Sequence, residues 1–549
     1  MLRVLAPVIF LSITAFFFGC STTPESGERS ALSQALGEDD WSLPPSVQLS
    51  SDAGIYPDIL AISWKQLNPA EGVFDMRMLD SALILAAQQR IDFFVVPYLA
   101  DRDFVPEWVI QKYRLAAYRF PFNPTYQTQI GPISQGYFVP IWNEGYQQEL
   151  RFFLRTLAQH RIFQSPRFKF MYFPGAWRWG EFTVEFTHQM KEDGLTPQLY
   201  IASIQRLIDL FTTAFQGKEH TLVWTGYDNL EYCDQETIWR DYIGRQISHY
   251  ALSKGVGARH GGIERFNWAL SDIPNWGTSL DTIGGKIYMR TNESVPLLAD
   301  HRRIFGAEAE CFGTCEGGGL EKTLGTYYHK KMTMLKALQL RMRWIDVDKD
   351  FAREYPSLYE YVRKSVGKSV TTSPDCWVAL RGAHDDAYPH ENVGANKFLV
   401  HNWERWLYQR DIEPNGSTVL ADMTPDAWQK LAEPVYESRQ TYHAQKQDYI
   451  YFDVDDRFAQ QHNGGAHTLK VTYLDNFVGS WYVEYSTDST PYKKSFPVRN
   501  QNDGQWKTVS LLLPDVHFLN KQQGGMDFRI YNGGTNDIRV RFVRLLGYS

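Results

Sequence analysis

The sequence predicts two structured regions, an α/β domain with a parallel sheet and then an antiparallel β-sandwich. Between about residue 58 and residue 346, short apolar segments alternate with helical stretches, the pattern of parallel strands joined by crossover helices. From about residue 449 onward, short strands follow one another with Gly, Asn and Asp between them, which is typical of an antiparallel sandwich. The chain of 549 residues is long enough for two or three domains, each with its own core.

The first residues form a targeting segment. Arg3 provides a positive charge, and the apolar run that follows, Val4–Phe18, is too short to span a bilayer comfortably. The run ends in a glycine and Cys20, which resembles the bacterial lipobox, although Phe17 stands where Leu is usual. The resemblance implies a lipoprotein signal peptide over residues 1–20, lipidation of Cys20 and a place in the cell envelope. Ser21, rather than Asp, favours the outer membrane, at its periplasmic or surface face; a plain cleaved signal peptide is the alternative.

Residues 21–45 are rich in Ser, Thr, Gly and acidic residues and are expected to form a flexible tether. Five strands are then predicted in the α/β region: Ile59–Trp64, Asp92–Leu99, Phe168–Pro174, Thr221–Tyr227 and Arg303–Ala307. The predicted helices are Met76–Arg90, Glu144–Gln159, Leu199–Phe215, Glu236–Leu252 and Thr323–Asp346. Residues 101–140 carry many aromatics and prolines without a period, which favours a loop that shapes a site.

The texture of the sequence changes after about residue 371, so the domains are expected to cover residues 46–370 and 371–549. The second region begins with a predicted strand over residues 376–381 and a predicted helix over 425–446. The strands that follow are Tyr449–Val454, Thr468–Leu474, Ser480–Ser486, Trp506–Leu513, Asp527–Tyr531 and Arg539–Leu546. Asp453, Asp455 and Asp456 are compatible with a Ca²⁺ site, but an Asp-rich turn needs no ion, and whether this sandwich binds glycan or calcium stays open.

Composition excludes several classes of function. The net charge of −7 gives no basic field for nucleic acid. No nucleophile elbow, P-loop, dinucleotide-binding motif or His-Glu-x-x-His motif is present, so no cofactor or metal is predicted. His384, Asp385, Asp386 and His390 cluster, but a solvated loop explains them better than a metal site. The four cysteines after Cys20 allow three disulfide connectivities, among which the sequence does not choose. Aromatic residues, 15% of the chain, suit stacking on sugars as well as ordinary cores.

Two segments resemble a known family. Residues 62–75 read Ile-Ser-Trp-Lys-Gln-Leu-Asn-Pro-Ala-Glu-Gly-Val-Phe-Asp, and residues 105–108 read Val-Pro-Glu-Trp. They resemble the second and third strand regions of clan-A retaining glycoside hydrolases, particularly the family 42 β-galactosidases and relatives. The resemblance covers roughly residues 55–320. It implies a (β/α)8 TIM barrel and makes the next strand, Phe168–Pro174, the fourth.

In that clan the general acid/base glutamate follows the fourth strand, a position that Glu181 fits. An extended segment would place Trp177, Trp179 and Glu181 on one face. Two indoles beside a carboxyl group would stack on a sugar and raise the pKa of the acid. The sequence departs from the clan at Gly180, where Asn is common, so the usual contact to the sugar 2-hydroxyl is unaccounted for.

The nucleophile is expected from the seventh strand of the clan, which Arg303–Ala307 resembles. Glu308 stands directly at the end of this strand and Glu310 follows two residues later, so both are candidates, with Glu308 preferred. A retaining reaction needs the two carboxyl groups roughly 5–5.5 Å apart. The remaining candidates for sugar contacts are Trp64, Trp108, Arg178, Tyr227, Asp228 and Tyr288. Further polar residues could line the pocket, although an ordinary loop or solvated position explains each at least as well: Asn229 and Glu231 after the fifth predicted strand, and Arg259, Glu264 and Arg265 further on.

The sequence therefore predicts a lipid-anchored glycosidase that acts on β-glycosidic bonds by retention, with a carbohydrate as its partner and an oligomeric state left open. Residues 401–411 and the following sandwich are loosely similar to proteins near enzymes that degrade algal galactans, so agar or carrageenan fragments, with β-galactoside bonds, are the expected substrate direction. A non-catalytic glycan-binding surface lipoprotein is the alternative, and Gly180 is the feature that favours it.

Overall fold

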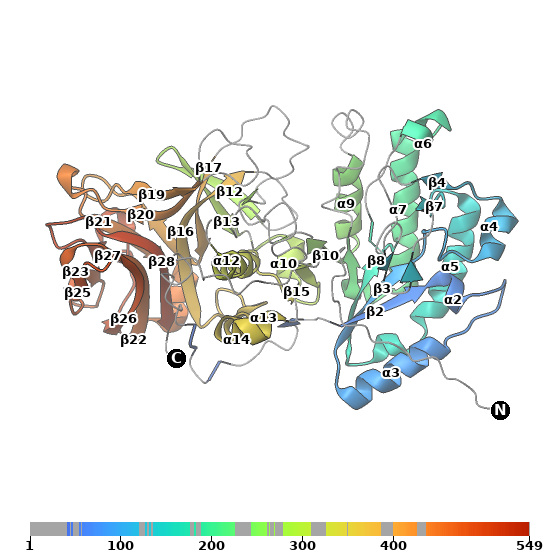
Figure 1. Ribbon diagram of the computed structural model, residues 1–549, viewed down its shortest axis with the longest axis horizontal. Helices are drawn as coiled ribbons and strands as arrows, with labels where there is room; N and C mark the ends of the chain where they lie inside the picture. The colour runs from blue at the N-terminus through green and yellow to red at the C-terminus, as the bar shows by residue number, and fades with distance from the viewer. Residues whose placement is uncertain are drawn as a thin grey trace, which may run out of the picture.

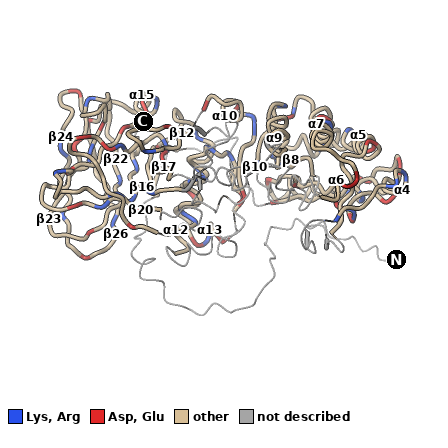
Figure 2. The backbone as a smooth tube through the Cα atoms, turned by 90° about the horizontal axis from the view of Figure 1, so that it is seen from above, with Lys and Arg blue, Asp and Glu red and all other residues tan. Residues whose placement is uncertain are grey.

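The computed structural model describes most of the chain after residue 40. The described residues are 41–43, 46–47, 54–55, 58–119, 127–128, 131–132, 136–175, 181–182, 188–225, 243–260, 263, 268–269, 278–291, 293–308, 325–347, 350–385, 399–424 and 435–547. The antiparallel sheets lie at one end of the molecule and the helices α4, α5 and α7 at the other (Figure 1). Positions of cationic and anionic residues are interspersed along the backbone at both ends (Figure 2).

An eight-stranded parallel sheet forms the first region. In chain order its strands are β1 (Gly54–Ile55), β2 (Ile59–Ser63), β3 (Phe93–Tyr98), β8 (Phe168–Phe173), β9 (Leu222–Trp224), β10 (Gly257–His260), β14 (Phe305–Glu308) and β15 (Trp344–Asp346). Their order in the sheet is β1-β15-β14-β10-β9-β8-β3-β2. The α/β class is therefore confirmed, and β8 and β14 are the fourth and seventh strands, as predicted.

The sheet does not close into a complete barrel, which corrects the predicted (β/α)8 barrel. Its two edge strands, β1 and β2, are separated only by residues 56–58. A parallel pair needs a crossover of about a dozen or more residues, so the chain can run from β1 into β2 but cannot pair them side by side. The result is a curled sheet whose two edge strands, β1 and β2, follow one another in the chain.

Helices cover the outer face of the sheet. Those between the strands are α2 (Trp64–Leu67), α3 (Arg77–Gln89), α4 (Glu107–Tyr113), α5 (Glu144–Ala158), α6 (His188–Glu192), α7 (Pro197–Ala214), α9 (Ile243–Ser253), α10 (Pro296–Ala299) and α12 (Thr326–Gln339). Local sequence explains their starts: Asn143 accepts a hydrogen bond from the Tyr146 amide at the start of α5, and Thr196 caps α7, in which Pro197 takes the first turn. The predicted helix Thr323–Asp346 extended too far, because its last residues form β15.

The C-terminal region consists of two antiparallel-rich sheets packed over an apolar core. The larger contains β11 (Trp268–Ala269), β12 (Thr278–Ile283), β13 (Lys286–Thr291), β16 (Asp375–Asp385), β17 (Leu399–Arg405), β19 (Val419–Thr424), β20 (Val435–Gln440), β22 (Gly465–Asp475), β26 (Gln505–Val516) and β28 (Arg539–Gly547). The smaller contains β18 (Leu407–Arg410), β21 (Tyr449–Val454), β23 (Val478–Tyr485), β24 (Lys493–Lys494), β25 (Val498–Gln501) and β27 (Phe528–Tyr531). Residues 435–440 are strand β20, which corrects this part of the predicted helix 425–446.

One hairpin links the two regions. β12 and β13, which precede β14 in the chain, form an antiparallel pair, and β13 joins the larger C-terminal sheet parallel to β17. Gly284 and Gly285 form the turn with φ angles of 56° and 75°, the left-handed conformation that a two-residue hairpin requires. The sequence analysis missed this hairpin, although a Gly-Gly pair between alternating strands is a recognised signal.

Several elements fill the space between the two regions. Helices α12, α13 (Asp350–Glu354) and α14 (Pro356–Ser365) lie there in Figure 1. Trp41 packs among them, with its ring centroid 4.8 Å from Tyr361 and 5.8 Å from Phe542 of β28. Because α14 and β28 belong to different regions, this tryptophan joins both.

Candidate active site

The site is built where the parallel strands reach their carboxyl ends, called here the mouth of the sheet. Glu308 is the last residue of the seventh strand and Asp346 the last of the eighth, and the two are register partners. The residues that precede them, Ala307 and Ile345, belong to the core on the other face of the sheet. Since side chains alternate along a strand, Glu308 and Asp346 both point to the inner face of the curled sheet.

An aromatic layer supports the mouth from below. Phe94, Phe170, Tyr172 and Trp344 pack together on the inner face, with centroids 4.7 Å apart for Phe94–Phe170 and for Phe170–Trp344. Gly306 makes room for this layer, because a Cβ atom there would lie 2.2 Å from the Trp344 indole nitrogen. The described interior of the sheet is therefore packed below the mouth.

Arg259, on the sixth strand, joins the two predicted catalytic carboxylates. Its Nη2 lies 3.0 Å from Oε1 of Glu181 and 2.5 Å from Oε2 of Glu308. The side chains of Arg259, Glu181 and Glu308 are only 2%, 10% and 12% exposed. Both oxygens lie on one nitrogen, so they cannot be farther apart than the sum of these distances. Two carboxyl groups with oxygens this close are compatible with the roughly 5–5.5 Å separation of retaining glycosidases.

Tyr172 holds the other oxygen of Glu308. It lies on the fourth strand, and its hydroxyl donates a hydrogen bond to Oε1 of Glu308. Burial, and then the negative charge of Glu308, raise the pKa of Tyr172 well above its usual value. The phenol therefore stays protonated and acts as a donor, which fixes the orientation of Glu308 from one side while Arg259 fixes it from the other.

Glu181 is positioned through its neighbour Phe182. The Phe182 amide donates a 3.0 Å hydrogen bond to Oγ1 of Thr225, which directly follows the fifth strand. The Phe182 ring is fully buried, 5.1 Å from the Trp224 ring. These contacts bring residue 181 to the mouth, although seven residues separate it from the end of the fourth strand at Phe173.

Asp346 completes what we call the carboxyl cluster, which comprises Tyr172, Glu181, Arg259, Glu308 and Asp346. Asp346 is 8% exposed. Burial first, and then the charge of Glu308, raise its pKa well above the usual value for an aspartate, and Arg259 opposes this only in part. Its surroundings therefore favour the protonated form of Asp346, while Glu308 receives both the guanidinium and the phenol.

The predicted site residues fall into three groups: those that meet at the mouth, those that lie elsewhere in the structure, and those outside the described residues. Glu181 and Glu308 come together at the mouth. Trp64 is instead a core residue, fully buried against Tyr146 and Phe153 of α5, and Tyr288 is buried in the C-terminal sheet under Arg410. Trp108, on α4, is partly buried and donates its indole N–H to the Asn68 carbonyl. Cys20, Trp177, Arg178, Trp179, Tyr227, Asp228 and Glu310 lie outside the described residues.

Sequence reasoning did not single out three members of the cluster. Arg259 was noted only as one of several loop residues, because its strand, β10, was not predicted. Tyr172 was part of a predicted strand, and strand alternation with Phe170 was the available signal for its inward direction. Asp346 was assigned to a helix, so its place at a strand end could not be seen.

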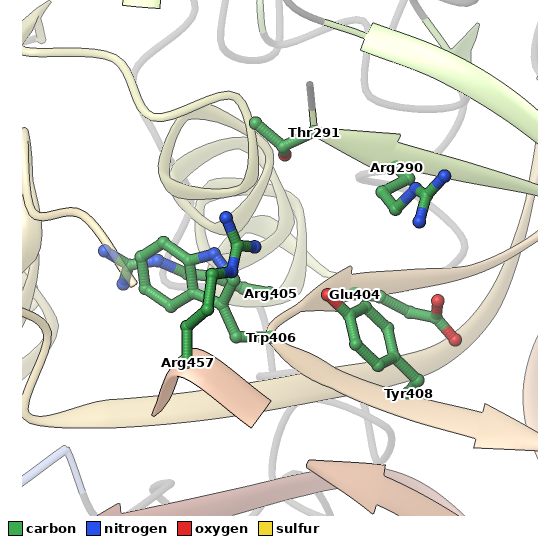
Figure 3. Close-up of a pocket in the computed structure, with 7 residues that line it drawn as sticks. All are labelled: Arg290, Thr291, Glu404, Arg405, Trp406, Tyr408 and Arg457. Carbon is green, nitrogen blue, oxygen red and sulfur yellow. The ribbon is translucent and has the colours of Figure 1, made fainter. Parts of the chain in front are cut away.

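A small pocket lies elsewhere, among β13, β17, β18 and α15 (Asp456–His462), and shares no residue with the carboxyl cluster. Figure 3 shows its lining residues: Arg290, Thr291, Glu404, Arg405, Trp406, Tyr408 and Arg457. Its charges are already neutralised, since Arg290 pairs with Asp281, Arg457 with Asp455 and Glu404 with Arg410. It therefore contributes to the packing of the hairpin.

Two further findings concern the described residues only. In that part of the chain, no group of three or more His, Cys, Asp or Glu side chains is arranged to hold a metal ion. No helix within the same ranges is long and apolar enough to cross a membrane.

Comparison with known proteins gives weak matches. No family model and no curated protein matches the chain. An exo-β-1,4-mannosidase from Opitutaceae bacterium strain TAV5 matches over 34% of this chain and 26% of its own length, with 11% identity and a TM-score of 0.20. A β-galactosidase from the psychrophilic Marinomonas ef1 matches over 40% and 39%, with 11% identity and a TM-score of 0.23. This chain thus spans well under half the length of either enzyme.

A carbohydrate-binding module of Cellvibrio mixtus lichenase 5A, solved with cellotriose, matches over 25% of this chain and 93% of its own, with 11% identity and a TM-score of 0.15. The chain is thus similar to glycoside hydrolases and to a carbohydrate-binding module. TM-scores this low do not establish a shared fold, so function has to be argued from the side chains at the mouth.

Proposed function

We propose that the protein is a retaining glycoside hydrolase whose nucleophile is Glu308 and whose general acid/base is Glu181. The observation that carries this proposal is the pair of carboxylates on one guanidinium nitrogen at the mouth of a parallel sheet. This arrangement supports a double displacement, because it keeps the two carboxyl groups close enough to act on the two sides of one bond.

In the first step an oxygen of Glu308 attacks the anomeric carbon, and the bond to the leaving oxygen breaks as Glu181 gives that oxygen a proton. In the second step Glu181 takes a proton from water, the water oxygen attacks the same carbon, and Glu308 is released. Tyr172 and Arg259 serve this chemistry by donating hydrogen bonds to the two oxygens of Glu308 and so holding it in one orientation. β-Galactosides from algal galactans such as agar or carrageenan are the substrates we propose, on the sequence resemblance alone.

The contact between Arg259 and Glu181 sets a condition on the mechanism. A guanidinium favours the ionised form of a carboxyl group, whereas a general acid must carry a proton. Substrate binding therefore has to separate Glu181 from Arg259, so that the Glu181 oxygen meets the leaving oxygen instead. The free enzyme described here is a resting arrangement in which both carboxylates share one cation.

The same contact favours a second candidate function, a glycan-binding protein without catalysis. If Arg259 and Glu181 stayed paired when the ligand binds, Glu181 could not donate a proton, and the mouth would only bind sugar. The two candidates differ in turnover, which the following experiment measures.

The test is hydrolysis of a panel of 4-nitrophenyl β-D-glycosides and of β-linked algal and plant oligosaccharides. Wild type is expected to cleave at least one of them, with the β-anomer as the first product seen by NMR. Glu308→Gln should lower kcat by about 10⁴-fold or more, as loss of a nucleophile does, and Glu181→Gln by about 10²–10⁴-fold.

The matched control is Asp92→Asn, which removes a carboxylate paired with Arg167 and Lys169 just before the third strand, far from the mouth. It should keep full activity. Glu310→Gln tests the alternative nucleophile in the same way. Binding of an oligosaccharide without cleavage of any substrate would support the non-catalytic candidate, and full activity in Glu181→Gln would refute the acid/base assignment.

We also propose that Cys20 is lipidated and holds the protein at the outer membrane, on the basis of the signal sequence alone. In a two-membrane bacterium grown with labelled palmitate, wild type should carry the label and sediment with the envelope. Cys20→Ser should lose both properties; an unlabelled, soluble wild type would instead support a plain cleaved signal peptide.

A further inference from the structure

Asp346 is the one member of the carboxyl cluster for which the double displacement has no use. It is nine-tenths buried, yet no hydrogen bond or ion pair joins it to another side chain of the described residues. Its hydrogen-bonding partner is the backbone of Val347, the next residue. A buried polar side chain without a side-chain partner costs stability, so its presence calls for an explanation.

The position of Asp346 points to a ligand. It is the register partner of Glu308, so the two side chains stand side by side on neighbouring strands, which are about 4.8 Å apart. Both face the mouth from the inner side of the sheet. A sugar whose anomeric carbon contacts Glu308 would therefore also present part of its ring to Asp346.

The groups around Asp346 decide what kind of partner it accepts. Glu308 faces it from β14, Arg259 from β10 and Asp58 from the segment just before β2, so two acids and one guanidinium surround it. Arg259 is already engaged with Glu181 and Glu308. A buried carboxyl group accepts a hydrogen bond through either oxygen, and in its protonated form, which burial favours, it also donates one, so it matches a sugar hydroxyl group.

We propose that Asp346 contacts the sugar bound at Glu308 and forms a hydrogen bond with one of its hydroxyl groups, and thereby selects an uncharged sugar at this subsite. The proposal rests on the proposed function, because it uses Glu308 as the place of the anomeric carbon. Sulfated or carboxylated positions are excluded there, because Glu308 places a negative charge beside Asp346. Anionic groups of a substrate must lie on other sugar units.

The expected size of the effect is large. A site built to bond a hydroxyl group rejects an analogue that lacks it by about 10⁴–10⁵-fold, because the polar group of the protein is left without a partner. A site that merely surrounds the sugar with apolar groups discriminates far less, by about 10–200-fold. Discrimination between matched substrates therefore distinguishes a contact from a structural role.

The experiment compares the 4-nitrophenyl glycoside that wild type cleaves fastest with its monodeoxy analogues. In wild type, kcat/KM should fall by about 10³-fold or more for one deoxy position. In Asp346→Ala, kcat/KM for the parent substrate should fall by a similar factor. For that deoxy analogue, kcat/KM should fall only a little below its value with wild type. Equal losses on all substrates in Asp346→Ala would mean that the residue only supports the structure, and would overturn the proposal.

Two further measurements keep the outcomes separate. Asp346→Asn keeps the size and hydrogen-bonding capacity of a neutral carboxyl group, so it should retain most discrimination, and Asp92→Asn should behave as wild type. If wild type cleaves nothing, the proposed function fails, and calorimetric binding of the same unreacted sugars is compared instead. Weaker binding by Asp346→Ala, confined to sugars that carry the selected hydroxyl, would still support the contact; unchanged binding, or no binding to wild type at all, would overturn it.

Discussion

Two buried clusters of Tyr, Glu and Arg can be compared in this molecule. One is at the mouth of the parallel sheet, where Tyr172 and Arg259 contact Glu308. The other joins α12 to the larger C-terminal sheet, where Tyr328 and Arg381 contact Glu437. The two use the same three side-chain types, and they differ in how charges and hydrogen bonds are matched.

In the C-terminal cluster one guanidinium serves one carboxylate. Arg381 donates to Glu437 through Nε at 3.0 Å and Nη2 at 2.9 Å, and both side chains are at most 1% exposed. Thr424 donates to the same carboxylate at 3.4 Å. This is the bidentate, closed geometry that makes a buried ion pair tolerable, and it leaves no position for a ligand.

At the mouth one guanidinium nitrogen serves two carboxylates, and a third carboxyl group, Asp346, lacks a side-chain partner among the described residues. A mouth with one guanidinium for each carboxylate, as in the C-terminal cluster, would have stabilised the fold more. The excess of carboxyl groups is therefore the feature by which the mouth differs from the C-terminal cluster, and it is what the proposed function would require.

The strongest test of this difference removes one carboxylate from each cluster. Glu437→Ala should lower the free energy of unfolding by about 3–5 kcal/mol, because it leaves Arg381 buried without its counter-ion. Glu181→Ala should lower it by clearly less, since Arg259 keeps Glu308 as its counter-ion. Chemical denaturation followed by tryptophan fluorescence measures both.

A paired replacement is the control for that test. Glu437→Leu combined with Arg381→Met should recover most of the loss, because apolar side chains of similar volume replace a buried pair at little or no cost. Equal losses for Glu437→Ala and Glu181→Ala would show that both clusters are structural.

The two tyrosines give the next test. Tyr328→Phe should cost about 1.5–3 kcal/mol of stability, the value of a hydrogen bond to a charged group, and leave hydrolysis unchanged. Tyr172→Phe should mainly lower kcat/KM, by about 10–100-fold, because Glu308 loses the donor that orients it. Unfolding curves and initial rates on one substrate measure both variants, and a loss of activity in Tyr328→Phe alone would reverse the assignment of the two clusters.

The smallest expected effect concerns the pH dependence of stability. The pKa of Asp346 is raised on folding, so the folded state keeps a proton that the unfolded chain releases above about pH 3.9. Stability due to this group is present below that pH and is lost as pH rises toward the raised pKa. Asp346→Asn has no group that titrates at this position, so it cannot lose this stability. At pH 7 the Tm of the variant should therefore exceed that of wild type by a few degrees.

Near pH 3 the two proteins should melt together, because Asp346 is then protonated in both states. Scanning calorimetry between pH 3 and pH 8 shows the divergence. A variant that is less stable than wild type at every pH would indicate that Asp346 makes a hydrogen bond on which the fold depends.

Much of the fold could be predicted from the sequence because its signals are local. The strand Ile59–Ser63 and the strand Phe93–Tyr98 are continuous apolar runs, and the structure buries almost all of their residues. Glu308 could be identified because it ends such a run. The strands Gly257–His260 and Trp344–Asp346 could not, since the first contains Arg259 and His260 and forms no apolar run, and the second directly follows a helical pattern.

The sequence alone determined the α/β and antiparallel regions and the two glutamates that follow the fourth and seventh strands, because strand patterns and strand ends are properties of neighbouring residues. Only the tertiary structure decided that β1 and β2 leave the sheet unclosed, that Arg259 holds Glu181 and Glu308 together, and that Asp346 stands beside Glu308. The last two relations join residues far apart in the chain. All three depend on how the strands are ordered in the sheet, which the pattern along any one segment does not encode.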